Sequence, residues 1–210
     1  MFAAQRRARR VYAAESRALA AADRRFAMLV DRYGPVVLEG PTRPDRRFDA
    51  LCEAITYQQL HATAAAAIWG RLRAVAGGRL EPGPVEALGI DGLRATGLSE
   101  AKARAMLDLA HQVRSGAVPL HRLGRLDDAA VVEVLSRVWG IGRWTAHMVL
   151  IFDLHRLDVW PVDDYGVRAG WAQVTGLAGP PSPRELEAAG AHLAPWRSLA
   201  AWYCWRIVDG

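Results

Sequence analysis

Glycine- and proline-containing links divide nearly the whole sequence into segments whose apolar residues recur at helical spacing. No segment shows the apolar–polar alternation of a half-buried strand, and no repeat of roughly 20–50 residues recurs. The pattern therefore predicts an all-α protein of about nine or ten helices joined by short links. The expected helices cover residues 3–32, 46–76, 84–88, 91–95, 99–115, 126–138, 143–154, 163–176, 183–193 and 195–208, with a loop at 35–45.

Composition excludes several classes of protein. A chain of 210 residues that is 51% hydrophobic and 23% charged is not a disordered protein. The uninterrupted apolar runs, such as Met148–Phe152, are too short to cross a bilayer. Cys52 and Cys204 are too few for a disulfide scaffold, a four-cysteine zinc site or an iron–sulfur cluster. Two thiols fit a reducing compartment, so we expect a cytoplasmic protein, associated with the nucleoid if its source is bacterial.

Positive charge is concentrated near the N-terminus. Residues 1–32 hold eight arginines against three acids, whereas the remainder is balanced. This distribution and a pI of about 9.7 permit binding to nucleic acid. The arginine-rich segment continues into a helical pattern, so we count it as part of the fold and not as a targeting peptide. Lys102 is the one lysine, and hence the one candidate for Schiff-base chemistry.

Two glycines separated by one residue join two predicted helices within residues 136–146, a segment called the hairpin below. Gly140 and Gly142 lack a Cβ, so the backbone there can turn tightly and approach a partner closely. A helix that begins near Arg143 would direct N–H groups and a positive dipole end toward a phosphate. Taken alone, the motif fits an ordinary helix–helix link with a glycine C-cap equally well. Three carbonyls at the end of the preceding helix could hold a monovalent cation such as Na⁺ or K⁺, those of Ser136, Val138 and Gly140.

An acidic pair, Asp163 and Asp164, follows Pro161 at another expected helix start. One of the two would cap the helix and complement its dipole. A second acid exceeds what a cap needs, and an ionised carboxylate there could stabilise a developing sugar cation. The chain also has eight tryptophans, of which several would pack in the core. Indole faces also stack on bases and attract cations, so a base-binding pocket is a reasonable interpretation.

Together these features resemble the helix-hairpin-helix (HhH-GPD) DNA glycosylase superfamily, and within it most resemble the 3-methyladenine DNA glycosylase II branch. The resemblance covers roughly residues 46–208. It depends most on residues 140–146, 161–165 and 195–198, with weaker support from 55–60 and 97–103. It implies an all-α fold with two helical lobes around a DNA-binding cleft. The expected single unit, 1–210, comprises an N-terminal helical segment and loop (1–45), a helical lobe (46–125), and the hairpin, catalytic aspartate and C-terminal helices (126–210).

The resemblance also implies roles for individual residues. The catalytic aspartate of the family falls on Asp164, and a slip of one residue would give Asp163 as the second choice. The wedge that fills the gap left by an extruded base falls on Gln59 or Leu60. The residues implied to line the base pocket are Trp144, Met148, Tyr165 and Trp205. The residues implied to contact the DNA backbone are Gly140, Ile141, Gly142, Arg143 and Thr145.

The implied activity is base excision repair of alkylated purines, 3-methyladenine and 7-methylguanine, in double-stranded DNA. Hydrolysis of the N-glycosidic bond would give a free base and an abasic site. The lyase branch has a lysine where this chain has Trp144, so we expect a monofunctional enzyme. We expect no required cofactor, although a structural Na⁺ or K⁺ could bind at the hairpin. We also expect no iron–sulfur cluster, no membrane partner, and a monomer. Departures from the family pattern include Trp139 in place of a hairpin proline, His61 in place of a common serine, and Met148 where one family member has a pocket-lining aromatic.

Two alternatives stay open at this point. A glycosylase of the same fold could act on neutral lesions such as hypoxanthine or ethenoadenine, for which hydrogen bonding would matter more than indole stacking. A non-catalytic helix-hairpin-helix DNA-binding module would need Gly140 and Gly142 but not Asp164.

Overall fold

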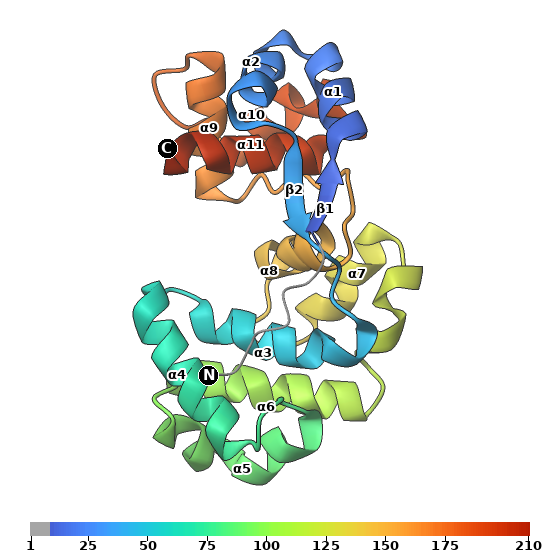
Figure 1. Cartoon of the computed structure of the whole chain (residues 1–210). Coiled ribbons are helices and arrows are strands. Elements are labelled where there is room, and N and C mark those ends of the chain that lie inside the picture. Colours follow the sequence, from blue (N-terminus) through green and yellow to red (C-terminus); the bar gives the residue numbers. More distant parts are fainter. Residues whose placement is uncertain (1–8) are drawn as a thin grey trace. The chain divides into compact units, whose positions relative to one another are not determined.

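The computed structural model describes residues 9–210, and its contacts group the chain into two compact units (Figure 1). Unit 1 comprises Met1–Pro41 and His147–Gly210, and unit 2 comprises Thr42–Ala146. The hairpin, expected within the 126–210 segment, therefore lies wholly in unit 2. Residues 3–8 of the first predicted helix lie outside the described residues. No helix between residues 9 and 210 is long and apolar enough to span a membrane.

Unit 1 is built from both ends of the chain around helix α11 (Arg197–Asp209), which contacts α1, α2 and α9 (Figure 1). Its aromatic core includes Phe26, whose ring centroid lies 6.4 Å from that of Trp171 and 6.3 Å from that of Tyr203. The other elements of unit 1 are β1 (Arg9–Tyr12), α1 (Ala13–Ala22), α2 (Arg24–Tyr33), β2 (Val36–Glu39), the π-helical turn η3 (Val149–Asp153), α9 (Tyr165–Thr175), α10 (Pro183–Ala189) and the 3₁₀ turn η4 (Ala191–Leu193).

A two-stranded sheet corrects two local predictions, because residues 9–12 are not helical and residues 36–39 are not an irregular loop. Strands β1 and β2 pair antiparallel, with Tyr12 opposite Val36. Tyr12, Val36 and Leu38 are buried in the core of unit 1. Each strand has four residues, so an alternating pattern is too short to stand out from the sequence. The all-α class is otherwise confirmed.

Unit 2 consists of helices connected by short links, as the sequence predicts. The segment 46–76 divides into two helices, and the predicted break between 84–88 and 91–95 is confirmed at Gly89, where φ is 60° and the backbone is not helical. Ser99 caps its helix by accepting a 3.3 Å hydrogen bond from the Lys102 N–H. The elements are η1 (Pro44–Arg46), α3 (Arg47–Tyr57), α4 (Ala62–Val75), α5 (Pro82–Ala95), α6 (Glu100–Arg114), η2 (Leu120–Arg125) and α7 (Asp128–Ser136), and α8 (Arg143–Met148) begins in this unit.

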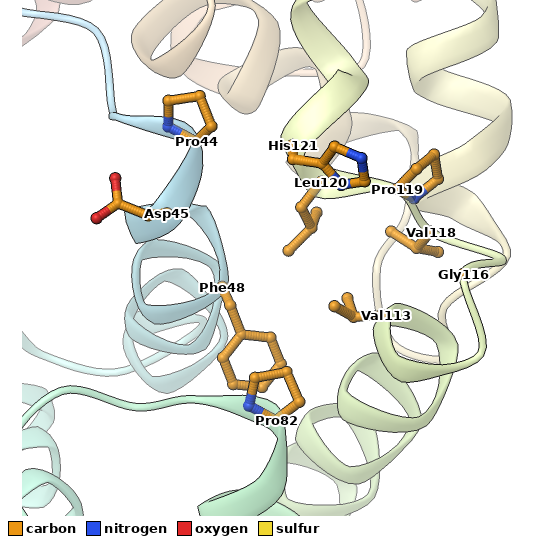
Figure 2. A pocket seen from close by; sticks show the side chains of 10 residues that line it. All are labelled: Pro44, Asp45, Phe48, Pro82, Val113, Gly116, Val118, Pro119, Leu120 and His121. Carbon is orange, nitrogen blue, oxygen red and sulfur yellow. The ribbon is translucent and has the colours of Figure 1, made fainter.

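A largely apolar hollow of about 190 Å³ lies in unit 2, where α3 begins and α6 ends. Figure 2 shows Phe48, Val113 and Leu120 pointing into it, whereas the carboxylate of Asp45 points away. The residues that line the hollow include none of the predicted site residues. This hollow is therefore distinct from the site that the sequence predicts.

Candidate functional site

Asp164 is fixed at the start of α9. Its Oδ1 accepts a 2.8 Å hydrogen bond from the Val167 N–H and a 2.9 Å hydrogen bond from the indole Nε1–H of Trp205. The residue is 9% exposed, whereas the neighbouring Asp163 is exposed. The prediction that one acid of the pair caps this helix is confirmed, and the capping residue is Asp164. The carboxylate thus has a set position and two neutral donors on one oxygen.

Two glycines on α9 allow α11 to come close to it. A Cβ at Gly166 would lie 2.9 Å from Cδ1 of Trp205 and 3.1 Å from Oδ1 of Asp164. A Cβ at Gly170 would lie 2.1 Å from the carbonyl oxygen of Cys204. Any larger side chain at these positions must displace the indole or the helix, because real Cβ atoms do not approach so closely. Sequence reasoning missed both glycines, although their separation by one helical turn places them on the same face.

An aromatic surface adjoins Asp164. The ring of Trp205 lies 5.6 Å from the ring of Phe152, centroid to centroid, with the planes inclined at 33°. Phe152 is 39% exposed and Tyr165 is 68% exposed. The guanidinium carbon of Arg168 lies 5.7 Å from the centroid of the Tyr165 ring. Sequence reasoning missed Phe152, which belongs to the π-helical turn η3, a geometry that often occurs at functional sites.

Salt-bridge and hydroxyl contacts hold the start of α11, the helix that carries Trp205. The guanidinium of Arg197 donates 2.7 and 2.9 Å hydrogen bonds to the two carboxylate oxygens of Asp158. The Ser198 hydroxyl donates to the Arg156 carbonyl at 2.7 Å and accepts from the Val159 N–H at 2.9 Å. Arg197 and Ser198 thus fasten α11 to the segment that leads into Asp164.

The hairpin turns at Gly140, where φ is 81° and a Cβ would lie 2.9 Å from the Cβ of Ala105. The glycine is therefore needed both for its backbone conformation and for close packing on α6. The preceding residue, Trp139, donates its backbone N–H to Oδ2 of Asp108 at 2.7 Å. Proline has no N–H, so the departure from the family pattern at position 139 creates a bond that a proline could not make.

The other hairpin glycine, Gly142, faces outward. No atom of residues 9–210 lies within 4 Å of a Cβ built at this position, beyond its immediate chain neighbours, and its φ is not positive. Arg143 beside it is exposed. Ile141 and Thr145 are buried, at 3% and 5% exposure, so their side chains present little surface to a partner of the hairpin. That these two residues contact DNA stays a prediction.

The remaining predicted residues near this segment differ in exposure. Trp144 is 45% exposed and belongs to unit 2, whereas Met148 is half-buried and belongs to unit 1. Among residues 9–210 no group of three His, Cys, Asp or Glu side chains is placed to bind a metal ion. Of the carbonyls predicted to hold a monovalent cation, that of Val138 accepts from the Ile141 N–H at 3.0 Å. A carbonyl oxygen has a second lone pair, so this bond is compatible with a cation ligand.

The predicted wedge lies in the link between α3 and α4, residues 58–61, called the wedge loop below. Gln59 has a φ of 52°, a conformation that residues other than glycine rarely adopt. Leu60 is 40% exposed. His61 caps α4, with its Nδ1 3.4 Å from the Thr63 nitrogen. An exposed apolar side chain thus sits next to a strained backbone, which is a feature of functional loops.

Comparison with known proteins gives a consistent set of relatives. Residues 52–195 match the sequence profile of the HhH-GPD superfamily base excision DNA repair proteins. DNA-3-methyladenine glycosylase 1 of Schizosaccharomyces pombe is 35% identical over 180 residues, which cover 81% of this chain and 79% of the relative. A solved structure of the 3-methyladenine DNA glycosylase of that yeast in complex with abasic DNA has a TM-score of 0.81 at 30% identity, with 94% of this chain and 97% of that chain covered. The crystal structure of a DNA-3-methyladenine glycosidase from Bacillus halodurans has a TM-score of 0.83 at 30% identity, with 95% and 91% covered.

Proposed function

This chain belongs to the HhH-GPD superfamily of base excision DNA repair proteins, and from that premise we propose that it is a DNA glycosylase for alkylated purines. It would hydrolyse the N-glycosidic bond of 3-methyladenine and 7-methylguanine in duplex DNA and leave an abasic site. The names of the relatives and the abasic DNA bound by one of them support this substrate class. The protein would work as a monomer in the cytoplasm.

The observation that carries the proposal is the carboxylate of Asp164, fixed by Val167 and Trp205 beside exposed aromatic rings. Glycosidic cleavage passes through an oxocarbenium-like state, which a nearby fixed anion stabilises. A carboxylate that is already oriented needs no reorganisation as the positive charge develops. Asp164 would therefore be the catalytic residue and would also orient the attacking water. Asp163, in solvent and not held as the cap, is the weaker choice.

The aromatic surface suits the proposed substrates. 3-methyladenine and 7-methylguanine are cationic in DNA, and a cation is attracted to the face of an aromatic ring. Trp205 and Phe152 would form one wall of the base pocket, with Tyr165 at its rim. Trp144 and Met148 remain predicted members of the same pocket. Because these bases are already good leaving groups, the enzyme would need little acid catalysis.

Unit 2 would supply the contacts to the DNA backbone. The outward-facing Gly142 has space for a phosphate where a side chain would intrude, and the exposed Arg143 would add a charge. A base must leave the stack before its glycosidic bond can be attacked. Gln59 or Leu60 would then fill the gap. The carbonyls of Ser136, Val138 and Gly140 would hold a Na⁺ or K⁺ ion that strengthens phosphate binding.

The proposed reaction ends at the abasic site, without strand cleavage. The lyase branch of the superfamily uses a lysine amine that forms a Schiff base with the sugar. Trp144 occupies the lyase position, and the ammonium of Lys102 is bound by the carbonyls of Thr56 and Gln58. No other lysine exists in the chain.

The direct test is release of free bases from methylated duplex DNA, measured by chromatography for the wild type, Asp164→Asn and the matched control Asp163→Asn. We expect 3-methyladenine and 7-methylguanine from the wild type and from the control, and roughly 100-fold slower release from Asp164→Asn. Equal release by Asp164→Asn would reject the catalytic assignment. No release by the wild type, with DNA binding intact, would favour neutral lesions or a non-catalytic module.

A further inference from the structure

One face of α6 contacts both loops that the proposed function brings to DNA. Lys102, Ala105, Asp108 and Gln112 lie three or four residues apart and so share a face of the helix. Lys102 contacts the end of α3 and the wedge loop, and the other three contact the hairpin. One rigid element thus sets the positions of both loops within unit 2.

The contact of Lys102 with the wedge loop is close. Its Nζ donates a 2.8 Å hydrogen bond to the Thr56 carbonyl and a 2.7 Å hydrogen bond to the Gln58 carbonyl. These carbonyls lie at the end of α3, where backbone oxygens lack partners within the helix and a positive charge is favourable. Burial lowers the pKa of Lys102. The ammonium of Lys102 thus loses part of its hydration and forms hydrogen bonds with these carbonyls instead.

Other contacts with the wedge loop are longer. The Gln58 N–H bonds to the Ala54 carbonyl at 3.2 Å, and the Leu60 N–H bonds to the Tyr57 carbonyl at 3.4 Å. The Gln58 side chain reaches the Gly140 carbonyl at 3.5 Å. The side chain of Leu60 itself is exposed and is not anchored in the core of unit 2. The strained conformation at Gln59 therefore depends strongly on the ammonium that holds the preceding carbonyl.

We propose that Lys102 is a positioning residue for base extrusion, which holds residues 58–61 in the conformation that fills the gap in the duplex. This inference rests on the proposed function, since it assigns a role in the same reaction. Lys102 does not touch the reacting atoms. It fixes the carbonyl of Gln58, and thereby the backbone from which Gln59 and Leu60 project.

The experiment compares Lys102→Met, Lys102→Arg and Leu60→Ala in single-turnover excision of one 7-methylguanine. Each enzyme is given the lesion in a paired duplex and in single-stranded DNA, where no pair needs to be broken. For Lys102→Met we expect about tenfold slower excision from the duplex and less than about twofold change in the single strand. Lys102→Arg, which keeps donors and charge, should recover part of the duplex rate. The double variant that combines Lys102→Met with Leu60→Ala should excise the base no more slowly than the slower of the two single variants, because both changes disable the same loop.

Equal losses on both substrates, or independent multiplicative losses in the double variant, would overturn the proposal. A separate measurement uses 2-aminopurine next to the lesion, whose fluorescence rises on unstacking, with every enzyme in the Asp164→Asn background. Lys102→Met should lower that signal, whereas an unchanged signal would also overturn the proposal. This readout requires no bond cleavage, so failure of the wild type to release bases would count against the proposed function and not against the role of Lys102. If Lys102→Met fails to fold, Lys102→Gln takes its place in both measurements.

Discussion

The N-termini of α9 and α8 differ in what is placed against their unpaired N–H groups and positive dipole end. At α9 the chain caps its own helix with the carboxylate of Asp164. At α8 the residue before the helix is Gly142, which has no side chain to cap it, and the first turn holds no acidic residue. One helix start thus carries a fixed negative charge, and the other offers a positive end to a ligand from outside. The difference matches the two charges the proposed reaction must handle, a sugar cation and a DNA phosphate.

The largest expected effect separates the two roles of Asp164. Both Asp164→Asn and Asp164→Ala should slow base release roughly 100-fold or more, because both remove the negative charge. Asparagine still caps a helix, whereas alanine does not, so only Asp164→Ala should also lower the free energy of unfolding, by about 1 kcal/mol. Single-turnover excision and denaturant unfolding measure the two effects. Equal destabilisation by Asp164→Asn and Asp164→Ala would contradict the separation of the two roles of Asp164, as a catalytic charge and as a helix cap.

The second effect concerns the outward-facing helix start. Gly142→Asp places a negative charge where a phosphate is proposed to bind, so affinity for undamaged duplex should fall about tenfold. The loss should not depend on the lesion, since a backbone contact carries no base information. Fluorescence anisotropy with damaged and undamaged duplexes at one fixed salt concentration measures it.

The two hairpin glycines supply the control for that measurement. Gly142→Ala meets no protein atom and should leave stability nearly unchanged, whereas Gly140→Ala combines a positive φ with a contact on Ala105 and should cost about 1–3 kcal/mol. Unchanged binding by Gly142→Asp would refute the proposed phosphate site.

The third effect, of similar size, concerns the indole that holds Asp164. Trp205→Phe removes the N–H donor to Oδ1 but keeps an aromatic ring near Phe152, so excision should slow by about tenfold, which corresponds to one hydrogen bond to a charged group. The matched control is Trp202→Phe on the same helix, whose ring packs on Tyr203. Equal losses in the two variants would show that general packing of α11, and not the bond to Asp164, accounts for the change.

The smallest effect tests a third helix start, that of α2. Asp23 caps it, like Asp164, but the carboxylate of Asp23 is bound by the side chains of Arg25 and His192. These contacts, led by the hydrogen bonds from Arg25, hold the pKa of Asp23 far below its ordinary value of 3.8. This aspartate therefore serves the fold, and Asp23→Asn should lower the free energy of unfolding by about 1–2 kcal/mol at neutral pH.

The pH dependence of that loss has a definite sign. Because the pKa of Asp23 is lowered on folding, its stabilising contribution is present above about pH 4 and disappears as the pH falls below that value. The free energies of unfolding of the wild type and Asp23→Asn should converge as the pH falls through this range. The exposed control Asp31→Asn should have the free energy of unfolding of the wild type at every pH. A gap that stays constant down to pH 2 would contradict the assignment.

The sequence predicted the features that depend on local chemistry. Asp164 caps its helix because a short polar side chain before an apolar run is the usual cap signal. The turn at Gly140 was likewise predicted from glycine. The order of the superfamily motifs then sufficed to identify the class of protein.

Features that depend on contacts between distant segments could not be predicted. The strands β1 and β2 are each too short to show a pattern, and they exist because they pair with each other. Phe152 reaches Trp205 from a π-helical turn, whose register the sequence does not reveal. The bonds of Lys102 and Asp108 likewise join α6 to loops far along the chain. In the sequence, each of these residues is indistinguishable from an ordinary helix or core residue, because its distant partner is not known.

The two cysteines have a consequence for a protein proposed to repair alkylation damage. Cys204 lies in unit 1 and Cys52 in unit 2, and both are fully buried. Burial raises the pKa of both thiols, so each sulfur stays protonated, and the protonated form is the weak nucleophile. Electrophiles that methylate DNA bases also attack thiolates, yet neither cysteine of this chain offers them an accessible thiolate. The chemical agent that creates the substrate would therefore leave both thiols of the repair protein largely untouched.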